Sequence, residues 1–189
     1  QILTLDFGQT FHHGIPVTQY LASVIEPTVS IAVVSLLISI SIAIPAGIIS
    51  ATRRGQIEDD IATLFAFWGI SIPGFWFGII LLLVFVAQFR LFPAFGYVSI
   101  TEGVIPWLWH VILPAIAVSP PYIGTTMRMV RSSMLEVLNS DYIVTAKSKG
   151  LNNRLVLAKH ALQNALIPVI TILGIFLGSL LAGVVAVEI

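Results

Sequence analysis

The sequence predicts an all-α fold, a polytopic transmembrane bundle with about four membrane-spanning helices. Of its 189 residues, 57% are hydrophobic and only 10% are charged, whereas a soluble domain usually carries about 25% charged residues. Four uncharged runs each exceed the roughly 20 residues that a helix needs to cross a bilayer: residues 27–52, 61–89, 103–127 and 161–187. Helices are expected because backbone polar groups in lipid must find partners within their own segment.

The basic residues predict the orientation of these helices. Eight of the nine lie in the connections after the first and third runs, and only Arg90 lies in the second connection. The positive-inside rule makes the side with eight cytoplasmic. We therefore expect an extracytoplasmic segment over residues 1–26 and a transmembrane domain over residues 27–189. The eight residues are Arg53, Arg54, Arg128, Arg131, Lys147, Lys149, Arg154 and Lys159.

Two further features concern the ends of the chain and its cysteines. The chain begins with Gln1 and closes on an apolar stretch, residues 182–189, so we expect an internal piece of a longer protein with further helices beyond each end. It contains no cysteine, which excludes a disulfide framework and a thiolate metal site from these residues.

Proline and glycine interrupt the apolar runs. Broken membrane helices are tolerated where they are buried in protein or line a water-filled cavity, which favours a transporter over a passive anchor. The interrupting residues are Pro45 and Gly47 in the first run, Gly69, Pro73 and Gly74 in the second, and Pro114, Pro120, Pro121 and Gly124 in the third.

The cytoplasmic connection, residues 131–160, is far longer than a turn requires, and its pattern predicts two short helices. Ser140 or Asp141 is a suitable N-cap for the first helix. Gly150 follows at the position where helices often end in the left-handed conformation, and Leu151 supplies the apolar contact that accompanies such an end. The second helix then leads into the membrane.

One face of the first of these helices is expected to meet another molecule. Tyr142, Thr145, Ala146 and Lys149 share a side by their spacing of three and four residues, which gives a face of small residues with a basic edge. Such a face suits a groove on a partner protein. The alternative interpretation is a surface helix lying along the lipid headgroups, which also uses lysine and tyrosine.

The stretch that carries the strongest resemblance reads DYIVTAKSKGLNNRLVLAKHALQNALIP. It resembles the signature loop of ABC importer permeases, in the form found in the dipeptide, oligopeptide and nickel family of binding-protein-dependent inner membrane components. Thr145 and Ala146 stand at the Ala-Ala pair of the general motif, and Gly150 is its glycine. Val144 replaces the general glutamate and Gln163 the general proline, which are departures that the peptide family shares.

The resemblance implies the type I permease fold of ABC importers and a coupling loop over residues 135–160. In this family the loop docks into a cytoplasmic ATPase and transmits its closure to the membrane helices. The implied partners are a second permease subunit, two ATPase subunits that bind ATP and Mg, an extracytoplasmic substrate-binding protein and membrane lipid, with no nucleic acid. The implied location is a prokaryotic inner membrane. The implied coupling residues are Asp141, Tyr142, Thr145, Ala146, Lys149, Gly150 and Leu151.

The resemblance also implies a substrate path between this chain and its partner permease. Peptides are the expected cargo, with nickel or a glutathione-like molecule as alternatives within the same family. Small and hydroxyl residues are equally favoured at helix–helix contacts, so packing remains the alternative for each candidate. The candidates for the path are Ser71, Pro73, Trp76, Tyr122 and Asn164.

No catalytic residue, metal ligand or cofactor of this chain itself is expected. The sequence has no G-x-x-x-x-G-K-[ST] phosphate loop and no G-x-S-x-G or HExxH motif, so ATP hydrolysis is assigned to the partners. A gradient-driven carrier or an intramembrane enzyme is disfavoured because no acidic residue lies inside a membrane run. His12 and His13 form a weak metal pattern and are interpreted as ordinary loop residues.

Overall fold

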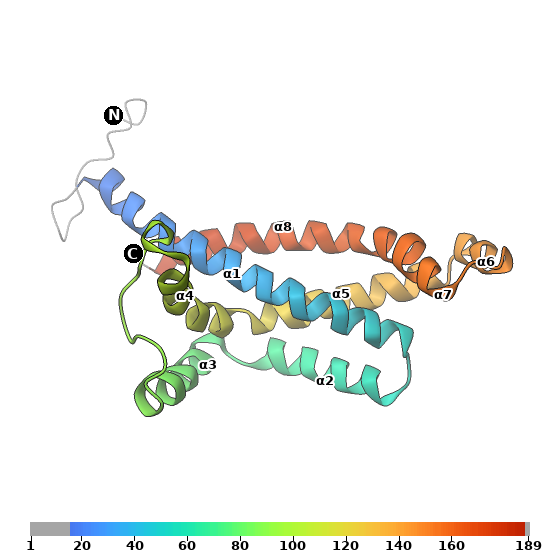
Figure 1. Cartoon of the computed structure of the whole chain (residues 1–189), viewed down its shortest axis with the longest axis horizontal. Coiled ribbons are helices and arrows are strands. Elements are labelled where there is room, and N and C mark those ends of the chain that lie inside the picture. The colour runs from blue at the N-terminus through green and yellow to red at the C-terminus, as the bar shows by residue number, and fades with distance from the viewer. Residues whose placement is uncertain (1–15, 188–189) are drawn as a thin grey trace.

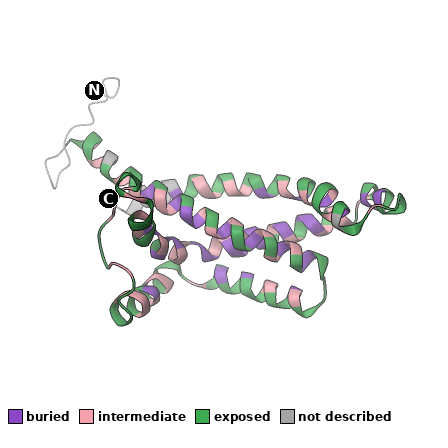
Figure 2. Cartoon of the chain, in the orientation of Figure 1, coloured by how far each residue is buried: buried purple, intermediate pink, exposed green. Residues whose placement is uncertain are grey.

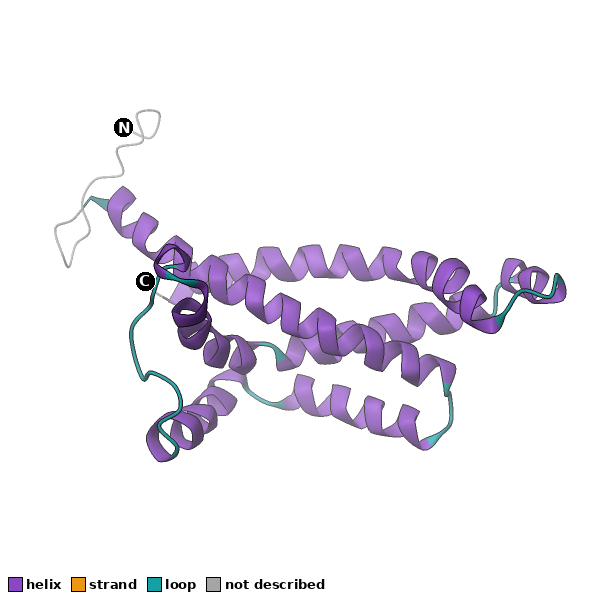
Figure 3. Cartoon of the chain, in the orientation of Figure 1, coloured by secondary structure: helices purple, strands orange, loops and turns teal. Residues whose placement is uncertain are grey.

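The structure is a computed structural model that describes residues 16–187, in which every regular element is a helix (Figures 1 and 3). This confirms the predicted all-α fold. His12, His13 and most of the expected extracytoplasmic segment lie outside the described residues. The elements are α1 (Val17–Thr52), α2 (Ile57–Ser71), α3 (Gly74–Leu81), a π-helical turn (Leu82–Gln88), a 3-10 turn (Ile100–Glu102), α4 (Val104–Val118), α5 (Pro120–Leu138), α6 (Asp141–Ser148), α7 (Asn153–Leu155), a second π-helical turn (Val156–Ala161) and α8 (Leu162–Val187).

The predicted crossings correspond to two long helices and two bent pairs. Within the described residues, α1 and the stretch Val156–Leu180 are each long and apolar enough to cross a membrane. The pairs α2 with α3 and α4 with α5 each meet the same criterion together, which gives four spans when each pair counts as one. α1 begins at Val17, upstream of the predicted run, so the expected boundary at residue 26 falls inside a continuous helix.

The bends occur at prolines. The helix axis turns by 96° between α2 and α3 and by 61° between α4 and α5. Ile72 is extended (ψ 125°) because Pro73 disfavours helical geometry in the residue before it. α5 starts at Pro120, which has no N–H with which to continue α4. Both interruptions were predicted. The predicted interruptions at Pro45 and Pro114 are wrong, since α1 and α4 run through these residues unbroken, and α2 and α5 likewise continue through Gly69 and Gly124.

α5 lies at the centre of the bundle, packed by α1, α2 and α8 (Figure 1). Two glycines allow its closest contacts. A Cβ atom at Gly47 of α1 would lie 2.8 Å from the carbonyl oxygen of Met127, and one at Gly124 would lie 2.4 Å from that of Ala66 in α2. Small residues of this kind let membrane helices approach backbone to backbone. The buried residues accordingly gather where α1 and α5 cross (Figure 2).

The aromatic outer loop is tied to the first helix by polar contacts. Ser30 of α1 lies 2.9 Å from the Tyr97 hydroxyl and accepts a hydrogen bond of 3.0 Å from the indole of Trp107. Phe92 stacks on Trp109 with a centroid distance of 4.8 Å. These rings therefore hold the loop against the end of the bundle in addition to suiting a membrane interface.

Candidate functional site

The first short helix of the cytoplasmic connection is α6, at the far end of the bundle from the outer loop (Figure 1). It starts directly after Ser140, whose backbone is extended (φ −78°, ψ 151°). The predicted start is therefore correct. The Ser140 hydroxyl makes no capping bond and donates instead to the carbonyl of Val137, so the side chain stabilises the turn that follows α5.

α6 ends in the hydrogen-bond pattern of a Schellman motif. The Leu151 amide donates to the Ala146 carbonyl at 3.4 Å, and the Gly150 amide donates to the Lys147 carbonyl at 2.9 Å. Gly150 has φ +76°, a left-handed conformation that glycine adopts without the steric cost of a Cβ atom. The prediction of a left-handed glycine at this position is confirmed.

One side of α6 packs on the rest of the chain. Ile143 is 0% and Ala146 8% exposed, and Leu151 packs against the same group of residues. We call this group the α6 core. Its buried members come from α1, α5, α6, the second π-helical turn and α8: Ala51, Val130, Met134, Ile143, Ala146, Val156, Ala161, Ala165 and Val169.

The other side of α6 is exposed and carries three of the four residues expected on a docking face. Tyr142, Thr145 and Lys149 are exposed, as are Asp141 and Gly150. The expectation for Ala146 is corrected, because this residue faces the α6 core. The pairing of Ala146 with Ile143, three residues apart and both apolar, was the signal for a buried side of the helix.

Asn164, expected in the path, lies beside α6 instead. Its amide nitrogen, from the start of α8, donates to the Tyr142 hydroxyl at 3.1 Å and to the His160 carbonyl at 3.0 Å. The first of these bonds links the first turn of α6 to α8. Asn164 therefore helps to orient α6, and its place in the path stays a prediction.

The other path candidates lie at two places, the bend between α2 and α3 and the first turn of α5. Ser71, Pro73 and Trp76 are exposed at the bend between α2 and α3. Tyr122 of α5 packs edge-on against Phe176 of α8, with a centroid distance of 4.9 Å. This contact agrees with the helix-packing alternative for Tyr122. No comparable helix-packing contact is found for the side chains of the three bend residues among the described residues.

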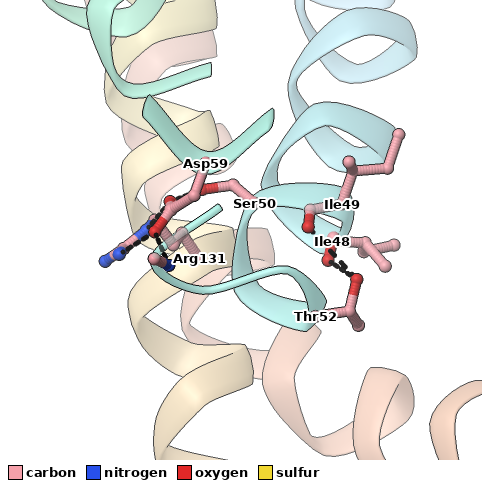
Figure 4. A network of polar contacts seen from close by, with 7 residues as sticks. Ile48, Ile49, Ser50, Thr52, Asp59 and Arg131 are labelled. Atoms are coloured by element: carbon pink, nitrogen blue, oxygen red, sulfur yellow. Dashed lines mark hydrogen bonds and ion pairs between the residues drawn. The ribbon is translucent and has the colours of Figure 1, made fainter. Parts of the chain in front are cut away.

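A buried ionic network that the sequence analysis missed joins three helices near α6 (Figure 4). The Asp59 side chain, 6% exposed, accepts two parallel bonds from Arg131, from Nε to Oδ1 at 2.7 Å and from Nη2 to Oδ2 at 2.8 Å. The Ser50 hydroxyl donates to Oδ1 at 2.5 Å, and the Gly55 amide donates to Oδ2 at 3.0 Å. We call these four residues the Asp59 network.

The Asp59 network fixes the ends of α1, α2 and α5 that lie nearest α6 relative to one another. Every carboxylate oxygen has two donors, so the buried charge is paired and hydrogen-bonded as such a group requires. Ala51, next to Ser50, belongs to the α6 core. The network and α6 are therefore parts of one packed region. No signal in the sequence marked Asp59 as buried, because its partner is 72 positions away.

The described residues contain no group of three His, Cys, Asp or Glu side chains that could hold a metal ion. The site is thus a packed surface with an ionic network behind it. Its exposed part offers hydroxyl, carboxylate and ammonium groups for contact with another molecule.

Comparisons with known proteins agree with this arrangement. The profile of the family described as binding-protein-dependent transport system inner membrane component matches residues 43–189. A probable peptide ABC transporter permease of Sinorhizobium fredii is 40% identical over 99% of this chain and 60% of its own length. An oligopeptide transport system permease of Bacillus subtilis is 39% identical over 97% of the chain and 59% of its own, and a dipeptide transport system permease of Escherichia coli is 34% identical over 97% and 61%. The chain spans about three fifths of the length of these relatives.

Proposed function

The chain belongs to the family of binding-protein-dependent transport system inner membrane components, and on that premise we propose that it is a permease subunit of an ATP-driven ABC importer of peptides. The observation that carries the proposal is the family match, which covers α6 and three of the four spans in full. Peptide is the proposed cargo because the three relatives described above are named as peptide, oligopeptide and dipeptide permeases.

In this proposal α6 is the contact point for a cytoplasmic ATPase. Tyr142, Thr145 and Lys149 form an exposed face on a helix whose end is fixed by the Gly150 cap. A docking helix needs a defined shape more than it needs reactive groups. The cap, the α6 core and the bond between Asn164 and Tyr142 supply that shape.

The α6 core is the route by which movement of the ATPase reaches the membrane helices. Ile143 and Ala146 share it with Val130 and Met134 of α5. Packed interiors have low compressibility and transmit strain, so displacement of α6 moves the end of α5 with it. The partner subunits bind ATP and Mg in this proposal. This chain contributes the helices that line the translocation path and change position.

The test is ATP-dependent uptake by the intact complex in proteoliposomes, with a second permease, the ATPases and the binding protein. We expect a labelled dipeptide or oligopeptide to accumulate only with ATP. Uptake driven by an ion gradient in the absence of an ATPase would overturn the proposal and indicate a secondary carrier.

A matched pair of variants tests the role of α6 in the same assay. Lys149→Glu reverses a charge on the proposed docking face, and Arg54→Glu reverses an exposed charge in the connection between α1 and α2, outside α6 itself. We expect Lys149→Glu to reduce uptake and retention of the ATPase, whereas Arg54→Glu leaves both near the wild-type level. Equal effects of the two variants would contradict docking through α6.

A further inference from the structure

α5 exposes polar side chains along one side. Thr125, Arg128, Ser132 and Glu136 follow one another at spacings of three and four residues, which places them on one side of the helix. Arg128, Ser132 and Glu136 are exposed and Thr125 is half-buried. We call these four residues the α5 polar stripe.

The free surface of α5 is therefore unsuited to lipid. Many large apolar side chains of the described residues are exposed, and they include Leu37 on α1 and Ile170 on α8, but none of them lies on α5. The apolar residues of α5 point the other way, and Met127 and Val130 pack against Gly47 of α1. The stripe thus lies on the side of α5 opposite α1.

Arg128, which the sequence analysis assigns to the cytoplasmic connection, lies beside the apolar run of α2. Its guanidinium carbon lies 4.9 Å from the centroid of the Phe67 ring. Phe67 is six residues inside the apolar run that starts at Ile61, or about 9 Å at 1.5 Å per residue. Side chains on α5 lean toward its N-terminal end, away from the cytoplasmic end, so the guanidinium group does not extend to the cytoplasmic interface.

No carboxylate of the described residues forms an ion pair with Arg128. The pairs within residues 16–187 join Arg53 to Glu58 and Arg131 to Asp59. An ionisable side chain at membrane depth is costly in lipid and almost always faces a bundle interior or a water-filled cavity. The ring of Phe67 satisfies the cation only in part. Water, or water together with a group of negative charge, is therefore expected on the open side of Arg128.

We propose that the α5 polar stripe lines the water-filled translocation path and that Arg128 binds the carboxylate of the transported peptide. This rests on the proposed function of peptide import. The planar fork of guanidinium N–H donors matches the two oxygens of a carboxylate, and every unmodified linear peptide ends in one. Ser132, one turn away on the cytoplasmic side, offers a hydroxyl group to the adjacent peptide backbone, and the Thr125 hydroxyl, which donates to the Pro121 carbonyl at 2.8 Å, can accept from a peptide N–H.

The first experiment measures whether the stripe meets water, independently of the cargo. Because these 189 residues contain no cysteine, Thr125→Cys and Leu37→Cys each place one thiol in this part of the chain. A negatively charged thiol reagent reacts with thiolate in water and hardly with a thiol in lipid. In the intact complex we expect Thr125→Cys to be labelled on this chain, and Leu37→Cys, which is 57% exposed on α1, to remain unlabelled. Absence of label at Thr125→Cys would overturn the assignment of the stripe to the path.

The second experiment measures carboxylate recognition by peptide uptake in proteoliposomes, with the binding protein saturated. Arg128→Gln should reduce uptake of a free-acid peptide by about tenfold or more, the effect of losing a charged hydrogen-bond partner. Uptake of the same peptide with an amidated C-terminus should change less than about twofold, since it offers no carboxylate to the guanidinium. Arg128→Lys should recover part of the uptake, because it keeps the charge without the fork.

The outcomes separate the two proposals. An equal fall for both peptides, or no fall for either, would overturn carboxylate binding by Arg128 while leaving peptide import intact. If the wild-type complex takes up no peptide, the proposed function fails and carboxylate recognition fails with it. The labelling of Thr125→Cys then still decides whether the stripe faces water.

Discussion

Replacement of Asp59 by alanine tests whether the Asp59 network holds the cytoplasmic ends of three helices together. The substitution removes a carboxylate that accepts two bonds from Arg131, one from Ser50 and one from the Gly55 amide. It leaves the Arg131 guanidinium without its partner. Loss of one partner from a buried ion pair costs about 3–5 kcal/mol.

The expected cost lies at the lower end of that range. The Arg131 side chain is 31% exposed, so water solvates part of the guanidinium once Asp59 is gone, and about 3 kcal/mol is the working value. A change of 1 kcal/mol shifts Tm by about 2–4 °C for a domain of this size. We therefore expect Asp59→Ala to lower Tm by about 6–12 °C. Arg131→Ala should lower it further, because it leaves the more deeply buried charge of Asp59 unpaired.

The assay is thermal unfolding of the intact complex in mild detergent, followed by intrinsic fluorescence. Arg53→Gln is the matched control, since Arg53 pairs with Glu58 in the same region but both side chains are largely exposed, at 55% and 40%. Exposed pairs contribute little, so its Tm should stay within about 2 °C of the wild type. An Asp59→Ala variant as stable as Arg53→Gln would refute the structural role of the network.

Two further predictions concern glycines. Gly124→Ala places a Cβ atom 2.4 Å from the Ala66 carbonyl oxygen and should destabilise the α2–α5 contact by about 1–3 kcal/mol or more. Gly174→Ala is the control, because its Cβ atom meets nothing within 4 Å, and it should leave Tm in the same assay unchanged. Equal Tm values for the two variants would contradict the close contact. Gly150→Val forces a β-branched residue into the left-handed region at a cost of about 1–2 kcal/mol and should reduce peptide uptake per ATP hydrolysed. Gly150→Asn should have a milder effect, because asparagine tolerates this conformation. The same uptake per ATP in both variants would refute the role of the cap.

The parts of the fold that were predictable depend on local rules. Proline at Pro73 and Pro120 limits the backbone wherever it occurs, and glycine at Gly150 permits an angle that other residues resist. These constraints act within a few residues, so the sequence alone locates them. Pro45 and Pro114 show the limit of the rule, because α1 and α4 continue through these positions.

The parts that were not predictable depend on which helices pack together. Asp59 and Arg131 resemble ordinary loop charges until α2 and α5 are placed side by side. Ala146 shares a spacing of three and four residues both with the exposed Tyr142 and with the buried Ile143, and its burial depends on the α6 core. Arg128 directly follows an uncharged run, and its contact with Phe67 depends on the close crossing at Gly124, which sets α2 beside α5.

In the proposed function and the proposed carboxylate site, one helix, α5, serves both coupling and transport. Its cytoplasmic half contributes Val130 and Met134 to the α6 core and Arg131 to the Asp59 network, while its open side carries Arg128. A helix moves as a rigid unit over this length, so a displacement of α6 that tilts or rotates α5 must also change the direction in which Arg128 points. Because Arg131 ties the same helix to α1 and α2, the motion is shared with those helices. We therefore expect binding at Arg128 and docking at α6 to be energetically linked through α5.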